Sequence, residues 1–463
     1  MRISLIALFA AVVSASPASA QDAGPHNLEA RAILKELIEI NTTDSSGSTT
    51  KAAEAMAARL KAAGFADADV QVLGPNPRKG NLVARLRGRT AGKPIVLLAH
   101  LDVVEALKAD WSADLDPFVF TERDGYFYGR GTSDDKNHAA IWIANLIRYK
   151  QEGFVPARDI VVALTADEEG GDSNGVKWLL ENHRSLIDAD YVLNEGGGGE
   201  LKDGKAVAHG VQAAEKKYYS VALEVRNPGG HSSLPRKDNA IYQLAAALTK
   251  LAAFEFPVEL NEITRSFFAR MASLETAQVA ADMKAVAQSA PDAAAAARLA
   301  AGSPMYNSMM RSTCVATQLT GGHAENALPQ QARAVVNCRL LPGADPRAVE
   351  QTLKQVVADE GIVFTTLWEP VASPASPLRP DLMAAVERHT TELWPGAIVL
   401  PFMSTGATDG LYLRNAGIPT YGVEGMFTEA NDVRAHGKDE RVGIKAFYDA
   451  REFLYRLVKT LGS

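Results

Sequence analysis

His100 and Asp102 are the first residues in the chain whose types and spacing could do chemistry together. They close the apolar segment PIVLLAHLD (94–102). Side chains two residues apart on a strand point to the same side, so the carboxylate could orient the imidazole as a metal ligand. The same spacing also occurs at ordinary strand ends. The pair therefore counts as a metal site only if further ligands join it.

An acidic turn follows in the segment GRGTSDDK (129–136). Gly129 and Gly131 permit an unusual backbone path. Asp134 and Asp135 would then lie at the mouth of a helix, where the helix dipole favours anions. An acidic helix N-terminus without a function would show the same pattern, and this alternative stays open for the segment taken alone.

Three more carboxylates close two other apolar segments. Glu168 and Glu169 end DIVVALTADEE (159–169), and Glu195 ends ADYVLNEGG (189–197). Adjacent carboxylates repel each other unless a cation or a proton lies between them. One of them could bind a metal while the other activates water. The alternatives are a solvated pair of loop carboxylates and a flexible acidic turn.

Together with His436, in AHGKDE, these residues form a set of metal-capable side chains. The candidate ligands are two histidines and three carboxylates: His100, Asp134, Glu169, Glu195 and His436. Glu168 is the carboxylate left over. Such a set suits two zinc-like ions about 3.5–4 Å apart that share one carboxylate. A single zinc would leave ligands unused, and calcium or magnesium would not favour imidazole.

The elements that must position these residues are predicted to be buried parallel strands. Continuous apolar runs are typical of strands covered on both faces, and helical patterns at 137–151 and 173–183 lie between such runs. This alternation predicts an open α/β sheet flanked by helices, whose ligand site lies beyond the carboxyl ends of its strands. The polar ends should therefore meet in one crevice. The predicted buried strands are 94–102, 159–169, 189–197 and 417–425.

A different pattern begins near residue 213. Alternating apolar and polar residues predict half-exposed antiparallel strands at 216–226, 312–320, 332–340 and 361–370, with helices at 238–252 and 345–358. The alanine-rich stretch 275–301 is predicted to be a helical excursion on the surface. We therefore expect an α+β domain at 213–370, inserted into a catalytic α/β domain formed by 21–212 and 371–463.

Composition and the N-terminus limit the classes of protein. The 463 residues are 47% hydrophobic and 22% charged, as in soluble globular proteins, and a net charge of −7 gives no basic excess for nucleic acid or an anionic membrane. Residues 1–20 have the basic start, apolar core and small-residue end of a signal peptide. A membrane anchor is the alternative, but the apolar run is too short to span a bilayer. We expect export, to the bacterial periplasm.

The two cysteines, Cys314 and Cys338, cannot form a cysteine-based metal cluster or a disulfide framework. An exported protein meets an oxidising compartment, so the two could pair. A hairpin centred near Asn326 would place them opposite each other. Two buried free thiols are the alternative, and the sequence does not decide between them.

The ordered motifs resemble the family of dinuclear zinc amidohydrolases and peptidases that includes glutamate carboxypeptidase, aminoacylase, carnosinase and succinyl-diaminopimelate desuccinylase. The resemblance spans nearly the whole mature chain, through AHLDVV, YGRGTSDDK, TADEEGG, NEGG, GGHSS, ENALP with CR, and AHGKDE. The first, second and fourth of these are most similar to the branch of vacuolar carboxypeptidase S and N-fatty-acyl-amino-acid hydrolase. Asn137 and His138 replace a usual glycine pair, and HGKDE replaces the commoner HGxNE. Neither departure removes a ligand.

The resemblance implies a role for each candidate. His100, Asp134 and Glu195 would hold one zinc, and Asp134, Glu169 and His436 the other, although Co²⁺ or Mn²⁺ could occupy the same ligands. Glu168 would be the general base and then the acid, with Asp102 as a second catalytic carboxylate. The peptide bond between Asp134 and Asp135 would be cis. We assign His138 to the helix surface or to packing.

The resemblance also assigns residues of the inserted domain. His231, in GGHSS, would reach the active site of a partner subunit, so the inserted domain would be both lid and interface of a homodimer. Asn326 and Arg339 would bind the substrate together with Gly406, in STGATDG. Arg339 is the natural clamp for a free carboxylate.

The expected function is hydrolysis of an amide bond next to a free carboxylate, in a peptide or an N-acyl amino acid. The enzyme would be a carboxypeptidase or an N-acyl-amino-acid hydrolase, and Glu168 would take a proton from a water between the two metals. A dipeptidase is the alternative among enzymes, and a non-catalytic binding protein on the same fold is the alternative outside them. The export signal disfavours a cytoplasmic desuccinylase.

Overall fold

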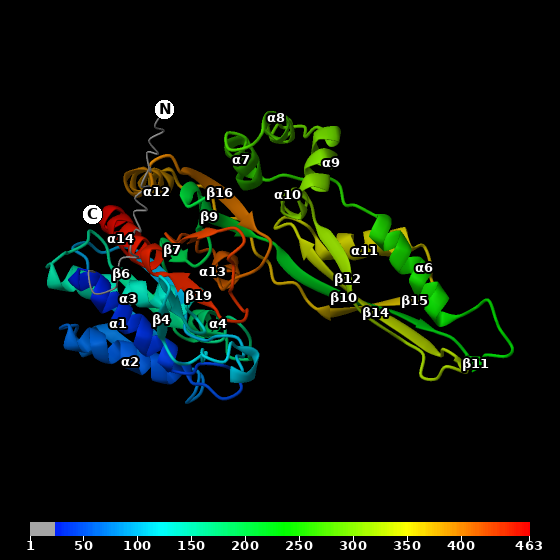
Figure 1. Cartoon of the computed structure of the whole chain (residues 1–463), viewed down its shortest axis with the longest axis horizontal. Coiled ribbons are helices and arrows are strands. Elements are labelled where there is room, and N and C mark those ends of the chain that lie inside the picture. Colours follow the sequence, from blue (N-terminus) through cyan, green and yellow to red (C-terminus); the bar gives the residue numbers. More distant parts are fainter. Residues whose placement is uncertain (1–23) are drawn as a thin grey trace, which may run out of the picture.

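The main sheet belongs to a large lobe of the computed structural model, which describes residues 24–463 (Figure 1). The signal peptide expected at 1–20 lies outside the described residues. The centre of this ten-stranded sheet has the strand order β6-β3-β7-β17, and these neighbours run parallel. Their residues are buried throughout, as continuous apolar runs predict. The central strands are β6 (Ile160–Thr165), β3 (Ile95–His100), β7 (Tyr191–Asn194) and β17 (Thr420–Gly422).

Helices cover both faces of this sheet because alternate strand residues point to opposite sides. Leu97 and Val162 pack with the larger helical layer, whereas Val96 and Val161 pack with the smaller one. The larger layer contains α1 (Pro25–Glu39), α2 (Thr49–Ala62), α3 (Lys136–Gln151), α12 (Pro380–Leu393) and α14 (Ile444–Leu461). The smaller layer contains α4 (Gly175–Asn182), α5 (Arg184–Ile187) and α13 (Gly410–Asn415).

The remaining strands of the sheet extend it on both sides. Two precede β6 in the strand order, β1 (Val70–Leu73) and β2 (Asn81–Leu86). The other side consists of β9 (Lys205–Glu215), β8 (Gly199–Lys202), β18 (Phe427–Glu429) and β16 (Ile398–Ser404), which pairs with β9. The prediction of an α/β domain with a mostly parallel sheet is confirmed in its centre, while β1, β2 and β8 pair with neighbours in antiparallel fashion.

A four-stranded antiparallel sheet forms the small lobe (Figure 1). Alternate residues such as Val221 and Leu223 face α6 and α11, whereas Val363 on the opposite face is exposed. This one-sided burial explains why apolar and polar residues alternate in the sequence of these strands. The strand order is β12 (Thr313–Gly321), β14 (Gln331–Leu340), β10 (Lys217–Arg226) and β15 (Ile362–Trp368), with helices α6 (Ala240–Ala253) and α11 (Pro346–Val357).

The alanine-rich stretch does not form a surface excursion. It forms two helices that share a core with β16 and β9 of the large lobe, in which Met283 and Leu299 pack with Leu400 and Ala208. The predicted helical structure is confirmed, but the buried face was not predicted, because alanine provides little apolar periodicity and only a few larger side chains mark that face. The four helices of this group are α7 (Glu262–Met271), α8 (Ala277–Val286), α9 (Ala293–Gly302) and α10 (Pro304–Met310).

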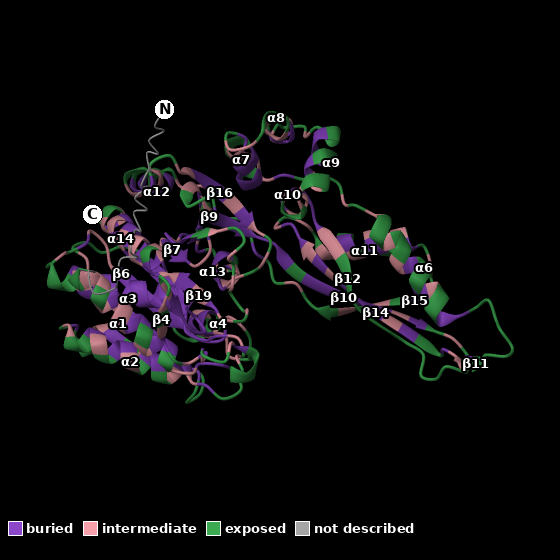
Figure 2. Cartoon of the chain, viewed as in Figure 1, coloured by how far each residue is buried: buried purple, intermediate pink, exposed green. Residues whose placement is uncertain are grey.

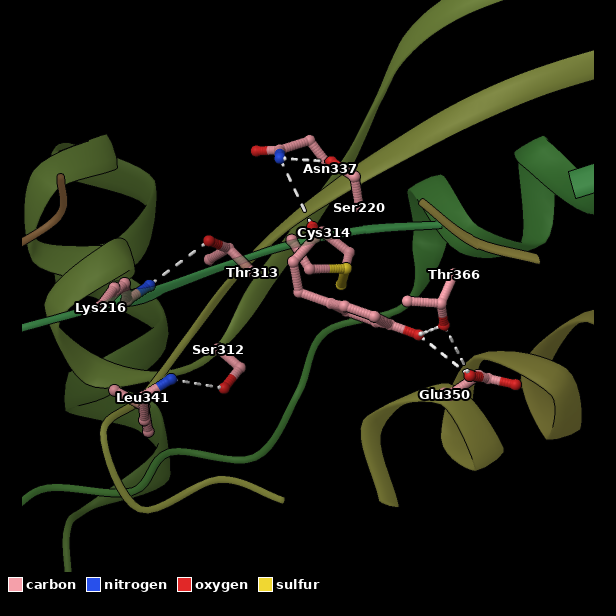
Figure 3. The surroundings of a disulfide bond; sticks show 11 residues. Lys216, Ser220, Ser312, Thr313, Cys314, Asn337, Leu341, Glu350 and Thr366 are labelled. Carbon is pink, nitrogen blue, oxygen red and sulfur yellow. Dashed lines mark hydrogen bonds between the residues drawn. A yellow bond between two sulfur atoms is a disulfide. The ribbon is translucent and has the colours of Figure 1, made fainter. Parts of the chain in front are cut away.

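Cys314 and Cys338 form a disulfide that ties β12 to β14 (Figure 3). The two residues are direct partners in the antiparallel register, as the hairpin centred near Asn326 predicts. The question left open by the sequence is therefore decided in favour of the bond. Beyond it the hairpin ends in a short pair, β11 (Gly230–His231) with β13 (Ala327–Leu328), which is among the most exposed parts of the small lobe (Figure 2).

None of the helices within residues 24–463 combines the length and the apolar character needed to cross a bilayer.

Candidate functional site

Three neighbouring strands deliver the acidic residues to one edge of the main sheet. His100 is the last residue of β3, Glu168 and Glu169 follow β6 closely, and Glu195 follows β7 directly. Since β6, β3 and β7 are parallel neighbours, their carboxyl ends lie side by side. The predicted convergence on one crevice is confirmed.

A separate three-stranded sheet brings the two remaining candidates to the same place. It consists of β4 (Thr121–Arg123), β5 (Tyr126–Tyr128) and β19 (Arg441–Gly443), with Arg441 paired to Tyr128. The segment with Asp134 starts directly after β5, and the segment with His436 ends directly before β19. Their strands therefore hold together two motifs that are about 300 residues apart in sequence. The peptide bond between Asp134 and Asp135 is cis, as expected.

Asp134 lies between two imidazoles. Its Oδ1 is 3.0 Å from His100 Nε2, and its Oδ2 is 3.2 Å from His436 Nε2. Glu195 Oε2 lies 3.9 Å from the same nitrogen of His100, and Glu169 Oε1 lies 2.8 Å from that of His436. Neighbouring ligand atoms of a tetrahedral zinc with bonds of 2.0–2.1 Å lie about 3.3 Å apart. Asp134 is thus close to both histidines, and two groups of three residues have ligand atoms within 4.8 Å of one another: His100, Asp135 and Glu195, and His100, Asp134 and Glu169.

The charges at the site are those of a cation site. Burial, and then the nearby Glu168 carboxylate, raises the pKa of Glu195 well above its usual range. Burial also favours the neutral form of Asp134, but hydrogen bonds with His100 and His436 outweigh it and hold its pKa below the usual range. The carboxylates of Asp134 and Glu169 raise the pKa of His436 to about 10. The protonated imidazoles thus compensate the negative charge of the carboxylates. Bound divalent ions would neutralise the same charge.

The orientation of His100 differs in detail from the prediction. Its Nδ1 is 3.0 Å from the backbone carbonyl of Asp102 and 3.6 Å from the Asp102 carboxylate. The ring nitrogen donates to the carbonyl, which leaves Nε2 free to face Asp134. The Asp102 carboxylate instead accepts the backbone N–H groups of Glu168, at 3.1 Å, and Glu169, at 2.9 Å. Asp102 therefore orients the acidic pair as well as the imidazole.

Both lobes line a cleft of about 560 Å³ that contains Glu168 and Glu169. The small lobe contributes Tyr218 and Arg339, whose guanidinium carbon lies 4.9 Å from the centre of the Tyr218 ring. Gly406 lines the opposite part of the cleft. Arg339 and Gly406, both predicted to contact substrate, are thus in the same cleft as the predicted base.

His231 and Asn326 lie elsewhere in the chain. They belong to the exposed end of the small lobe, where the Ser232 N–H donates to the Asn326 carbonyl at 3.0 Å (Figure 1). The eight residues of β10 between Tyr218 and its far end separate this tip from the cleft by roughly 25 Å. The expected pair of Asn326 and Arg339 is therefore not formed within one chain. The sequence spacing of the motifs did not indicate that Asn326 and Arg339 lie apart, because it does not show that long strands separate them.

Asp409 is a residue of the cleft that motif reasoning missed. Its buried carboxylate accepts hydrogen bonds from the Asn174 amide, at 2.5 Å, and from the Thr165 hydroxyl, at 3.4 Å. Burial raises its pKa to about 7. Asp409 ties the Gly406 loop to the turn that carries Glu168. The sequence signal that could have identified Asp409 is its position in STGATDG, the segment that also contains Gly406.

His138 is buried, so of the two predicted assignments, helix surface or packing, packing is the one that the structure shows. Its ring stacks on Trp142 with centroids 4.6 Å apart, and neither ring nitrogen has a hydrogen-bond partner. Burial, and then the charge of His100, lowers the pKa of His138 to about 3. It lies directly behind the site, because its Nδ1 is 3.6 Å from Asp135 Oδ1.

We predict that His138→Leu reduces the acid sensitivity of folding. The folded chain holds His138 neutral down to about pH 3, whereas the unfolded chain protonates it near pH 6.5, so stability falls as the pH drops below 6.5. Between pH 8 and pH 5, the wild type should therefore lose about 2 kcal/mol more unfolding free energy than the variant. Guanidinium unfolding at both pH values measures this, with the exposed His323→Leu as control. Equal pH dependence in the variant and the wild type would show that His138 is not held neutral.

Comparison with known proteins places the chain in a family. The model of the peptidase family M20/M25/M40 matches residues 96–460, which include all five candidate ligands and Glu168. N-fatty-acyl-amino acid synthase/hydrolase PM20D1 of Homo sapiens is 28% identical over 377 residues, covering 79% of this chain and 74% of that protein.

Solved structures share the fold. A metallo-carboxypeptidase of the M20 family from Sulfolobus solfataricus has a TM-score of 0.69 at 19% identity, covering 93% of this chain and 98% of that chain. The YXEP protein of Bacillus subtilis, a dinuclear metal binding peptidase of the M20 family, has a TM-score of 0.61 at 14% identity, with coverages of 94% and 98%. Since the family model spans most of its length, the chain is a hydrolytic enzyme of the peptidase family M20/M25/M40.

Proposed function

We propose that this enzyme hydrolyses an amide bond beside a free carboxylate, as a carboxypeptidase or an N-acyl-amino-acid hydrolase. One observation carries the proposal. The two ligand groups that share Asp134 adjoin a cleft that contains a spare carboxylate, Glu168, and a guanidinium, Arg339. The names of the relatives agree with this class of substrate, because the human protein is an N-fatty-acyl-amino acid hydrolase and the Sulfolobus protein a carboxypeptidase.

We propose that His100, Asp134 and Glu195 hold one zinc ion, and that Asp134, Glu169 and His436 hold the other. The donor set of imidazoles and carboxylates and its crowding of negative charge fit such ions, and the distances from Asp134 to His100 and to His436 support a shared Asp134. Co²⁺ or Mn²⁺ would accept the same donors. When bound, the ions would polarise the scissile carbonyl and acidify a water molecule.

Glu168 acts as the proton carrier. Burial raises the pKa of its carboxyl group well above the usual range, and the nearby Asp409 adds to this rise. A raised pKa strengthens a carboxylate as a base, so Glu168 takes the proton of the attacking water and then gives it to the leaving amine. The Asp102 carboxylate holds the Glu168 backbone N–H at 3.1 Å and thereby fixes the direction of this side chain.

Arg339 recognises the free carboxylate of the substrate. Its planar guanidinium can donate two parallel hydrogen bonds to a carboxylate. The stacked Tyr218 ring limits the freedom of the guanidinium and shields one of its faces from water. The backbone at Gly406 faces the same cleft and leaves space for the substrate, because a Cβ there would meet only the Ser404 hydroxyl, at 3.5 Å.

We predict that Glu168→Gln lowers the turnover of N-acyl amino acids and dipeptides by about 10²- to 10⁴-fold, the usual contribution of a general base. The variant should keep the metal content of the wild type, because Glu168 is outside both ligand groups. Hydrolysis of a substrate panel and metal analysis of the same samples measure both effects, with the exposed Glu360→Gln as control. Undiminished turnover would remove Glu168 from the mechanism. Activity confined to substrates with a free amino terminus would favour a dipeptidase.

We also propose that two chains pair through β12 and α6. β12 is an edge strand, and it exposes Val315 and Leu319 beside exposed Ile241 and Tyr242 of α6. An apolar edge of this kind invites pairing with another strand. A second copy, related by two-fold symmetry, presents the same apolar edge. On this proposal, residues 213–370 serve as both lid and dimerisation domain.

In such a dimer His231 would serve the active site of the other subunit. Its Nδ1 accepts hydrogen bonds from the Ser233 N–H at 3.2 Å and from the Ser233 hydroxyl at 2.7 Å. The proton of the neutral ring is therefore on Nε2, which points away from these partners. An exposed N–H donor held in this way is suited to stabilise the developing oxyanion. Asn326 lies beside His231 at the same exposed end of the small lobe and would enter the same active site of the other subunit.

Export to the periplasm is also part of the proposal. It rests on the signal peptide pattern of residues 1–20. The disulfide between Cys314 and Cys338 supports it, since such bonds persist in oxidising compartments.

We predict that co-expressed His231→Ala and Glu168→Gln chains restore activity that neither variant has alone. A mixed dimer contains one site with both intact residues, so random pairing should return about a quarter of the wild-type sites. The double variant co-expressed with Glu168→Gln is the control and should stay inactive. Turnover that stays at the level of the single variants would argue against catalysis by His231 across the interface.

A further inference from the structure

Glu440 is a fully buried carboxylate outside the ligand set that contacts the turn leading to Asp134. Its Oε1 accepts three backbone N–H groups, from Gly131 at 3.1 Å, Ser133 at 2.8 Å and Asp134 at 3.2 Å. Three donors that converge on one oxygen fix the path of a turn more firmly than side-chain packing does. The backbone of Asp134 is thus held directly by Glu440.

The other oxygen of Glu440 connects the same turn to His436. Glu440 Oε2 is 2.7 Å from Arg130 Nη1, and the two side chains are 0% and 4% exposed. Arg130 Nη2 in turn donates to the His436 carbonyl at 3.4 Å. One buried ion pair therefore spans the two segments that carry the shared carboxylate and one histidine.

The backbone of His436 needs such support. Its φ of +61° lies in the left-handed region, which is unfavourable for a residue with a side chain. A conformation of this kind persists only when surrounding contacts determine it. The bond from Arg130 to the His436 carbonyl and the bond from the Gly129 N–H to the Glu440 carbonyl, at 3.1 Å, provide these contacts.

The other half of the centre has supports of its own. The Asp102 carbonyl orients His100, and a different carboxylate, the half-buried Glu424, accepts the N–H of Gly196 at 2.8 Å, next to Glu195. Neither support involves Glu440 or Arg130. A change at Glu440 should therefore affect the two ligand groups unequally.

We infer that Glu440, acting through Arg130, is a positioning residue that sets the separation of Asp134 and His436 and thereby mainly the affinity of the metal site that contains both of them. This inference rests on the proposed function, because it requires that the residues bind two ions. The site made by Asp134, Glu169 and His436 depends on the Glu440 pair, and the ligands His100 and Glu195 do not. Neither Glu440 nor Arg130 would contact the substrate or a metal ion.

The test is a metal titration of chelator-stripped protein in which Co²⁺ is followed by its visible absorption and Zn²⁺ by competition with an indicator. Glu440→Gln keeps the size of the side chain but turns an NH₂ group toward the donors that the carboxylate accepted. We expect one of the two dissociation constants to rise by about 10- to 100-fold, the usual effect of losing an outer partner of a ligand. The other dissociation constant should rise less, because its site shares Asp134 but its ligands His100 and Glu195 have supports of their own.

Asp282→Asn is the matched control. Asp282 is also a buried carboxylate that binds an arginine, Arg298, at 2.6 Å, and it lies on α8 rather than beside the ligand groups. This variant also removes a buried carboxylate from an arginine, although Arg298 is 54% exposed, so it should lower the thermal unfolding midpoint and leave both dissociation constants unchanged. Loss of metal affinity from general destabilisation would instead appear in both variants.

A second pair of variants tests the link if Glu440→Gln does not fold. Arg130→Lys keeps the charge beside Glu440 and should retain more metal affinity than Arg130→Met. The inference is overturned if the wild type binds two ions and every variant binds them with wild-type affinity, an outcome that leaves the proposed function intact. A wild type that binds no ions would overturn the inference and the proposed metal centre together.

Discussion

Repulsion between carboxylates buried at one edge of the main sheet is the constraint on which the rest of the site depends. The sheet order forces β3, β6 and β7 to end side by side, so the carboxylates that follow them lie close together. Burial raises the pKa of Glu168 and Glu195, and only the imidazoles that flank Asp134 hold its pKa low. Such an arrangement is stable when cations occupy it, which links the fold directly to metal chemistry.

The supports of the site act mainly on the backbone. Asp102 accepts the N–H groups of Glu168 and Glu169, Glu440 accepts three from the turn at Asp134, and Glu424 accepts one beside Glu195. Asp102 and Glu440 are buried and Glu424 is half-buried, and each of them fixes a turn that carries side chains of the site. The small lobe adds Arg339 and Tyr218 to the cleft, so recognition of substrate requires both lobes.

The sequence predicted the features that follow from local patterns. Continuous apolar runs located β3, β6 and β7, and alternation located β10, β12 and β14, because burial on two faces or on one leaves different periodicities. The opposition of Cys314 and Cys338 followed from simple hairpin register. What the sequence could not predict depends on contacts between distant segments. The burial of His138, the distance of Asn326 from Arg339, and the roles of Asp409 and Glu440 belong to this group. The buried face of the alanine-rich helices was not predicted for a different reason, since alanine gives too weak an apolar pattern to show such a face.

The central claim is that Asp134 is shared by two bound metal ions, and metal stoichiometry tests it most directly. Wild-type protein, Glu195→Gln and Asp134→Ala would be dialysed against limiting zinc and their metal content measured by elemental analysis. The proposed ligand assignment predicts two ions in the wild type and one in Glu195→Gln, because Glu195 lies close to His100, at 3.9 Å, and is assigned to that ion alone. It predicts loss of both in Asp134→Ala, because each oxygen of Asp134 faces a different histidine. Two ions retained in Asp134→Ala would contradict the account.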